Sequence, residues 1–170
     1  TTGYSTADFA KWPMFSRAII MMLTVVGACA SSTGGGIKVS RLLVGMKCVK
    51  REITQLVHPK SVGIIRVGGK KVSSDVLRTI YIYFIAYIGI LISSIILVSL
   101  DNFDFETTFS AVLTTLGNVG PGMAKVGPMG NFADFSPFSK LVLCFDMLAG
   151  RLEIFPFLML FTAPAWRRKF

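Results

Sequence analysis

The sequence predicts an all-α membrane protein in which helix–pore-loop–helix repeats carry broken transmembrane helices. Its 170 residues are 52% hydrophobic with a mean hydropathy of +0.63, whereas soluble domains are about 45–50% apolar even when glycine is counted. Uncharged runs cover residues 18–37 and 79–100, and a third apolar segment, interrupted by four charges, covers residues 138–166. A glycine-centred polar loop also opens the chain and returns near residue 120.

The two polar loops form the first candidate site. One reads Thr1-Thr2-Gly3-Tyr4-Ser5 and the other Asn118-Val119-Gly120-Pro121-Gly122, and each adjoins a long apolar stretch. Non-helical backbone at membrane depth persists only where protein buries it or where it lines a water-filled cavity. Facing one axis, two such loops would offer rings of backbone carbonyls to a dehydrated cation, as potassium filters do.

The first long helix is expected to begin near Met14 and to break at membrane depth. Residues 27–36 are all small and end in Gly34-Gly35-Gly36. Each glycine opposes helix by about 1 kcal/mol relative to alanine, so the chain should leave the helix here and resume it near Ile37. Such a break needs protein or water around it.

Most of the net charge of +9 lies between the first two apolar segments. This distribution fits the positive-inside rule and indicates a cytoplasmic face rather than nucleic-acid binding. Asp8, Asp101, Asp104, Glu106 and Asp134 then fall on the outer side, where they are either solvated loop charges or a mouth that attracts cations. The ten basic residues are Lys38, Arg41, Lys47, Lys50, Arg51, Lys60, Arg66, Lys70, Lys71 and Arg78.

The cytoplasmic stretch should contain a hairpin, and the chain should then return through the membrane. His58-Pro59 ends the preceding helix, and residues 64–72 resemble a hairpin with a Gly-Gly turn. Residues 79–100 span roughly 33 Å as a helix, enough for the hydrocarbon core. Residues 106–116 are too few to span, so we expect a re-entrant helix whose carbonyl end points towards the ion path. Pro137 fits the first turn of the last helix.

Arg151 is a candidate functional charge in the last helix. It should lie near the middle of the bilayer, where an arginine costs about 2.5–3.5 kcal/mol on insertion scales. At 100° per residue it lies about 140° around the helix from Asp146, which shares a face with Glu153. Arg151 is therefore either an electrostatic barrier on a cation path or a charge neutralised by a structural partner.

These residues together resemble Trk-type potassium uptake proteins (the TrkH/TrkG family) over essentially the whole chain. The specific motifs are the glycine-rich break with its following Ile37-Lys38, the segment Arg51-Glu52…His58-Pro59, and Gly150-Arg151-Leu152-Glu153-Ile154-Phe155. Since the chain begins inside a motif, we expect it to be the C-terminal part of a longer protein. Asp146 departs from the neutral residue expected at its position, and Asn118-Val119 is less filter-like than Thr1-Thr2.

The resemblance implies potassium uptake across a bacterial inner membrane by a multi-pass protein. Residues 1–56 would end a third pore repeat, residues 57–74 would form a cytoplasmic hairpin linker, and residues 75–170 would form a fourth repeat. K⁺, the transported ion, would meet backbone carbonyls, and no covalently bound cofactor is implied. The implied partners are membrane lipid, a second copy in a homodimer, and a cytoplasmic nucleotide-binding regulatory subunit (TrkA-like). The implied filter residues are Thr1, Thr2, Gly3, Tyr4, Asn118, Val119, Gly120 and Pro121; the implied gate residues are Gly27, Gly34, Gly35, Gly36 and Arg151.

Two other functions compete with this interpretation. A substrate-binding secondary transporter also uses broken helices but favours inverted repeats, whereas both copies here run in the same direction. A non-transporting membrane anchor would leave the paired loops unexplained. An enzyme and nucleic-acid binding are not expected, because the sequence shows no paired carboxylates, metal cluster or nucleophile arrangement. Three cysteines without C-x-x-C spacing indicate neither a disulfide framework nor a metal site.

Overall fold

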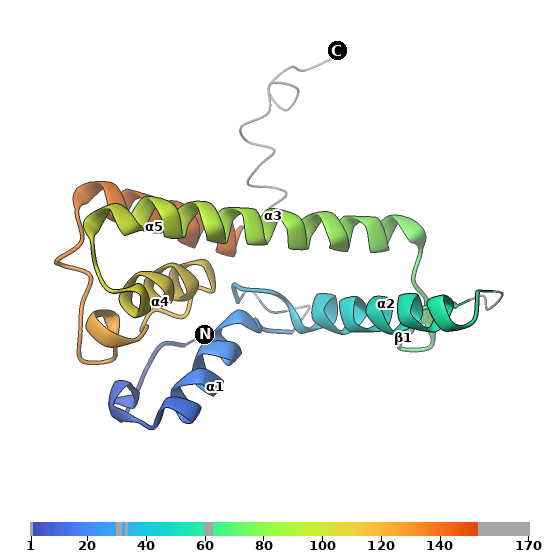
Figure 1. Ribbon diagram of the computed structural model, residues 1–170, viewed down its shortest axis with the longest axis horizontal. Helices are drawn as coiled ribbons and strands as arrows, with labels where there is room; N and C mark the ends of the chain where they lie inside the picture. The colour runs from blue at the N-terminus through green and yellow to red at the C-terminus, as the bar shows by residue number, and fades with distance from the viewer. Residues whose placement is uncertain (1, 30–31, 33, 60–62, 153–170) are drawn as a thin grey trace, which may run out of the picture.

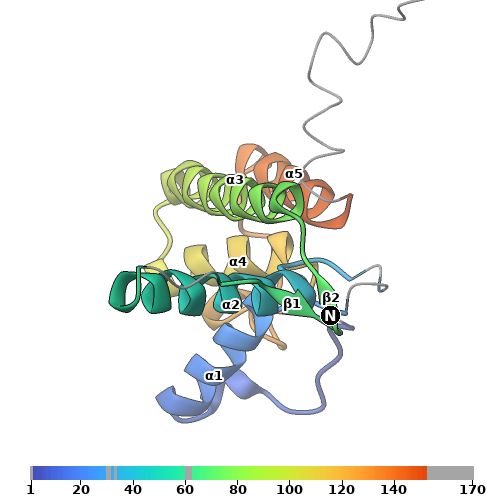
Figure 2. The same cartoon turned by 90° about the vertical axis from the view of Figure 1, so that its right-hand side faces the viewer.

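Helices and their connecting loops make up most of the computed structural model of the chain, which describes residues 2–29, 32, 34–59 and 63–152 (Figure 1). The longest helix, α3, runs along one side of the molecule, with α5 beside its C-terminal half and α2 along its N-terminal half (Figures 1 and 2). In chain order the elements are η1 (Phe9–Lys11), α1 (Met14–Val25), α2 (Val39–Val57), β1 (Arg66–Val67), β2 (Lys70–Lys71), α3 (Ser74–Val98), η2 (Ser99–Asp101), α4 (Phe105–Leu116), η3 (Ala124–Val126) and α5 (Pro137–Arg151).

α3 is the one helix within the described residues that is long and apolar enough to cross a membrane, counted from Ser74 to Asp101 through η2. Its N-cap is Ser73, whose side chain accepts a hydrogen bond from the Val76 N–H, so one of the four unpaired amide groups of the first turn is satisfied. α1 is also apolar but has only 12 residues. The third predicted apolar segment lies partly outside the described residues, because α5 ends at Arg151.

The segment between α2 and α3 is the predicted hairpin, in a short form. α2 ends at Val57, directly before His58-Pro59. Two-residue strands pair antiparallel with Arg66 opposite Lys71, and both turn glycines have positive φ, +57° and +78°. The hairpin closes a small core in which Val44 and Cys48 of α2 meet Ile65 and residues of α3.

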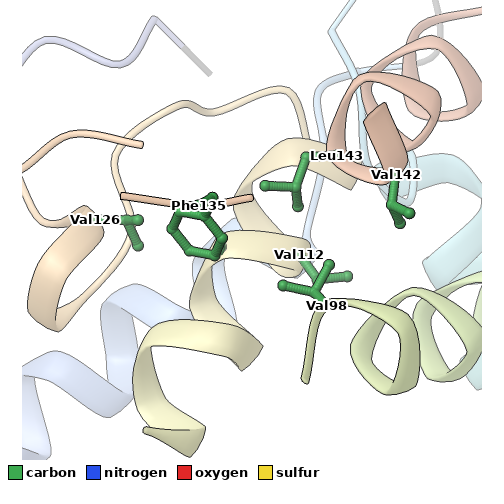
Figure 3. Packing of buried hydrophobic residues seen from close by; sticks show 7 residues of the cluster. Val98, Val112, Val126, Phe135, Val142 and Leu143 are labelled. Carbon is green, nitrogen blue, oxygen red and sulfur yellow. The ribbon is translucent and has the colours of Figure 1, made fainter. Parts of the chain in front are cut away.

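α4 is the buried centre of the fold. Nine of its twelve residues are buried, and it packs against α3, α5 and α1. At about 1.5 Å per residue it is roughly 18 Å long, about half of a membrane's thickness. Its middle, at Ala111 and Val112, belongs to an apolar cluster that joins α3, α4, α5 and the segment between α4 and α5, drawn in Figure 3. The labelled members are Val98, Val112, Val126, Phe135, Val142 and Leu143.

α5 begins as predicted at Pro137, with Ser136 as its N-cap accepting from the Ser139 N–H. It lies beside both α3 and α4. On its inner face Asp146 is fully buried, and the Ser94 hydroxyl of α3 donates to Asp146 Oδ1 at 2.6 Å. The other carboxylate oxygen is buried without a partner among the described residues. Asp146, which the sequence left without a role, therefore links α5 to α3.

Candidate ion pathway

The two polar loops lie against each other although 117 positions separate their central residues, Gly3 and Gly120. Gly3 has a φ of +79°, and a Cβ built on it would be only 2.5 Å from the Val119 carbonyl oxygen and 3.4 Å from Pro121 Cδ. A side chain at position 3 is thus excluded both by the backbone conformation, which L-residues rarely adopt, and by the opposite loop. Gly3 is the residue that lets the two loops meet.

Both loops line one open cavity of about 380 Å³. Gly120, with a φ of +105°, has no atom within 4 Å of a built Cβ, so it faces open space. The Tyr4 side chain is 94% exposed and does not pack between the loops. Thr1 lies outside the described residues. Of the eight sequence-predicted filter residues, the cavity brings together Thr2, Gly3, Tyr4, Val119, Gly120 and Pro121.

Asn118 belongs to a neighbouring cavity and has a structural task of its own. It lies directly after the end of α4 with a positive φ of 53°, which asparagine tolerates better than most residues. Its side-chain amide donates to the Met147 carbonyl of α5 at 3.1 Å. The adjoining cavity of about 570 Å³ is lined by Asn118, Val119, Gly120 and Thr2, with residues of α4 and α5. Asn118 therefore fixes the second loop to α5.

Hydrogen bonds hold the second loop in a tight reversal at the end of α4. The Asn118 N–H donates to Thr115 O at 3.0 Å and the Val119 N–H to Thr114 O at 2.8 Å, so carbonyls at the end of α4 have partners. Further along, the Ser110 hydroxyl accepts from the Met123 N–H at 2.9 Å. The loop is tied to the helix that precedes it at both of its ends.

The predicted break between α1 and α2 is a loop whose two ends are paired. α1 ends at Val25, and Val26 forms an isolated parallel bridge with Ile37. The Gly27 N–H donates to Ile37 O at 2.8 Å, and the Ile37 N–H donates to Val25 O at 3.2 Å. A Cβ on Gly27 would collide with the Gly35 carbonyl oxygen, so glycine is required where the two ends cross. We call residues 26–37 the glycine loop.

The glycine loop packs directly against the start of the second polar loop. A Cβ on Gly35 would lie 2.7 Å from Gly117 O and 2.8 Å from Asn118 Nδ2. A Cβ on Gly150 of α5 would collide with Leu116 O and lie 2.9 Å from the same Asn118 nitrogen. Gly35 and Gly150 each lie against the C-terminal end of α4 and the loop after it, and neither position has room for a side chain.

The remaining predicted gate residues lie around this contact. Gly34 is partly buried and its N–H donates to the Ser32 hydroxyl at 3.2 Å, and Gly36 is buried with a φ of +77°. The Gly36 carbonyl accepts from the Tyr83 hydroxyl of α3 at 3.4 Å. Arg151 is the last residue of α5 and is exposed, whereas Asp146 is buried on the opposite side. Glu153 lies outside the described residues.

Three of the acids that the sequence predicts on the outer side have local structural partners. Asp104 is the N-cap of α4: its Oδ2 accepts from the Thr107 N–H at 3.0 Å and its Oδ1 from the Thr107 hydroxyl at 2.7 Å. These bonds, led by the hydroxyl, hold the pKa of Asp104 below its ordinary value. Asp8 caps η1, and Glu106 pairs with Arg17 of α1. Capping and pairing thus give Asp8, Asp104 and Glu106 structural roles in the fold. Within the described residues no group of three or more His, Cys, Asp or Glu side chains could hold a metal ion.

Sequence reasoning missed three links around the loops. Each of these links joins residues that are distant in the chain. Asn118 bonds to α5, Tyr83 bonds to the glycine loop, and Arg17 pairs with α4. The only sequence signal was Arg17, a charge within an otherwise apolar first helix. Arg51 and Glu52 also pair at 2.6 Å on α2, within the motif that first indicated the family.

The described residues combine two glycine-centred loops that line one open cavity with a helix apolar enough to cross a membrane, a combination that suits a membrane transport protein. The family model described as "TrkH: Cation transport protein" matches residues 1–167. The chain belongs to this family, whose members are transport proteins and not enzymes.

Known relatives agree with this assignment. The chain is 38% identical to the Trk system potassium uptake protein TrkH of Salmonella typhimurium over 98% of its length, and 34% identical to TrkG of Escherichia coli K12 over 97%. The crystal structure of the potassium transporter TrkH from Vibrio parahaemolyticus matches with a TM-score of 0.86 and 39% identity over 97% of this chain. The chain spans 34% of the length of each of these two curated relatives and 35% of that crystallised chain.

Proposed function

We propose that the protein containing this chain takes up potassium through a pore whose filter includes both polar loops. The contact of Gly3 with Val119 across one open cavity carries this proposal, because it joins two loops that the sequence had only matched by pattern. Backbone carbonyls of Thr1 to Tyr4 and of Asn118 to Pro121 would replace the hydration shell of K⁺. The relatives TrkH and TrkG are potassium uptake proteins, which supports the same ion.

In this proposal, residues 1–56 end one pore repeat and residues 75–170 form the next, with residues 57–74 as a cytoplasmic linker. α4 is the re-entrant pore helix, since it is buried and too short to span. The partial negative charge at its carbonyl end then favours a cation beside the second loop. The protein is a multi-pass protein of the bacterial inner membrane, a homodimer, and the partner of a TrkA-like regulatory subunit.

The glycine loop is the proposed constriction below the filter, and Arg151 is its partner. Support comes from the approach of Gly35 to Gly117 and Asn118, which brings the loop against the filter itself. Movement of the loop would then be felt by the filter, and movement of α5 would reach both through Asn118 and Gly150. Arg151, next to Gly150, adds a positive charge that opposes cation passage.

The filter proposal is tested by replacing Gly120 with valine in the full-length protein. A β-branched residue at a φ of +105° must change the backbone and so turn the carbonyls. We expect a reduced preference for K⁺ over Na⁺ in a liposome flux assay. The matched control is Gly68→Val, because Gly68 also has a positive φ and open surroundings but lies in the hairpin. If both variants keep the parent's permeability ratio, the second loop is not part of the filter.

A further inference from the structure

Two adjoining cavities lie on the α2 side of the molecule, away from the polar loops. The first, of about 360 Å³, is lined by four cationic side chains: Lys47, Lys50, Arg51 and Arg66. The second, of about 690 Å³, is a groove between α2 and α3 lined mainly by apolar side chains, among them Met46, Val49, Ile53, Tyr81 and Phe84. Lys50 and Thr54 line both cavities, so the basic pocket and the apolar groove are neighbours.

The basic pocket retains unused positive charge. Glu52 pairs with Arg51 at 2.6 Å, and the other three lining cations have no carboxylate partner among the residues that the structure describes. Lys47 donates to the Arg66 carbonyl at 2.7 Å, which holds the pocket wall to α2. The Nε–H of Arg51 is buried and has no acceptor among the described residues. An anion with several oxygen acceptors would satisfy such donors.

The two cavities lie where the apolar stretch of α3 begins. Arg78 is the last charged residue before the uncharged run 79–100. Tyr81 and Phe84 follow it by three and six positions, about 5 and 9 Å further along the helix. The groove therefore starts at the edge of the hydrocarbon layer and the basic pocket lies just outside it. On α2, Met46, Val49 and Ile53 are all more than half exposed, at the spacing of one helix face.

We propose that these cavities are a binding site for one anionic phospholipid of the cytoplasmic leaflet. The phosphate of its headgroup lies among Lys50, Arg51 and Arg66, and an acyl chain lies along Met46, Val49 and Phe84. Basic pockets beside membrane helices on the cytoplasmic side are suited to anionic headgroups. A soluble acidic partner would use the charge but leave the apolar groove unexplained, whereas a phospholipid matches both halves. This site goes beyond the proposed transport function, and its place in the cytoplasmic leaflet rests on the topology proposed above.

Native mass spectrometry of the full-length protein, titrated with phosphatidylglycerol or phosphatidylcholine, tests the site. Each basic residue near a membrane surface contributes about fivefold to anionic lipid binding. Lys50→Gln combined with Arg66→Gln should therefore weaken phosphatidylglycerol binding about 25-fold and leave phosphatidylcholine binding unchanged. The control pair Lys71→Gln with Arg78→Gln removes the same charge outside both cavities and should have little effect. Equal binding of the two lipids by the parent, or equal losses in the two double variants, would overturn the proposal.

A second variant tests the acyl-chain half separately. Val49 is 60% exposed, so Val49→Trp should fill the groove without disturbing the fold and should weaken binding of the whole lipid at least tenfold. Competition by sn-glycerol 3-phosphate, which has the headgroup phosphate without acyl chains, should require a far higher concentration than the lipid. If glycerol phosphate competes as well as the lipid, or if a photo-crosslinker at position 49 captures protein instead of lipid, the proposal fails.

Discussion

Replacing Gly35 by alanine tests the contact between the glycine loop and the second polar loop. The φ of Gly35 is not in the left-handed region, so alanine meets no backbone penalty there and the effect is one of packing. The new Cβ would lie 2.7 Å from Gly117 O and 2.8 Å from Asn118 Nδ2. Ordinary contact begins near 3.4 Å, so the two loops must separate by about 0.7 Å.

The cost of that separation has two parts. Overpacking of a tight contact costs about 1–3 kcal/mol. Movement of the Asn118 side chain also breaks its 3.1 Å hydrogen bond to Met147 O, worth about 1 kcal/mol. We therefore expect Gly35→Ala to lower the free energy of unfolding by about 2–4 kcal/mol. Because the displaced loop no longer sits against the filter, potassium flux without the regulatory partner should rise.

The assay compares thermal unfolding in detergent and liposome flux for the full-length parent and two variants. Gly89 is the control, since it lies within α3, is exposed and has no atom within 4 Å of a built Cβ. Gly89→Ala should stabilise the helix by up to about 1 kcal/mol, the opposite sign. Equal stability and equal flux in the two variants would refute the proposed packing of the glycine loop on the filter.

Three further predictions concern charged residues. Arg151→Ala should raise potassium flux in liposomes. Arg151→Lys should give an intermediate flux, since lysine keeps the charge but loses the planar guanidinium group. A folded alanine variant that conducts like the parent would make Arg151 a structural charge. Asp146→Asn keeps an acceptor for the Ser94 hydroxyl. Asp146→Ala leaves that hydroxyl buried and unpaired and should lower the free energy of unfolding by about 1–3 kcal/mol. Equal unfolding temperatures of the two variants would contradict this. Asp104→Ala should cost about 1 kcal/mol through loss of the α4 cap. Because the folded-state pKa of Asp104 is lowered, its stabilisation is complete above about pH 4 and is lost as the pH falls through that lowered pKa. Asp104→Asn should lack this loss in unfolding measured from pH 3 to 7.

Helix ends could be predicted from the sequence because local chemistry decides them. Pro59 cannot continue a helix and restricts the residue before it, and α2 ends at Val57. Pro137 has the φ of a first helical turn, and α5 begins there. The run of glycines after residue 33 opposes helix, and α1 and α2 are separate helices on either side of it. Each of these signals acts within a few residues of its effect.

Contacts between distant segments could not be predicted in this way. Gly35 was expected to break a helix, yet Gly35 and Gly150 are both glycine at places where another backbone approaches. No residue near Asn118 in the chain predicts its hydrogen bond to the Met147 carbonyl, 29 positions away. Asp146 is a carboxylate in an apolar part of the sequence, and its hydrogen-bond donor is the hydroxyl of Ser94, 52 positions earlier. Such pairings depend on how the helices pack, which local propensity does not specify.

The bridge between Val26 and Ile37 also bears on how the family can vary. Because the two ends of the glycine loop are joined to each other, the positions of α1 and α2 are set at this junction and not by the number of residues beyond it. We therefore expect that residues added between Ala28 and Gly34 shift neither helix. On the same ground we expect family members to differ in length here, and a reporter group inserted here to leave the junction of α1 and α2 unchanged.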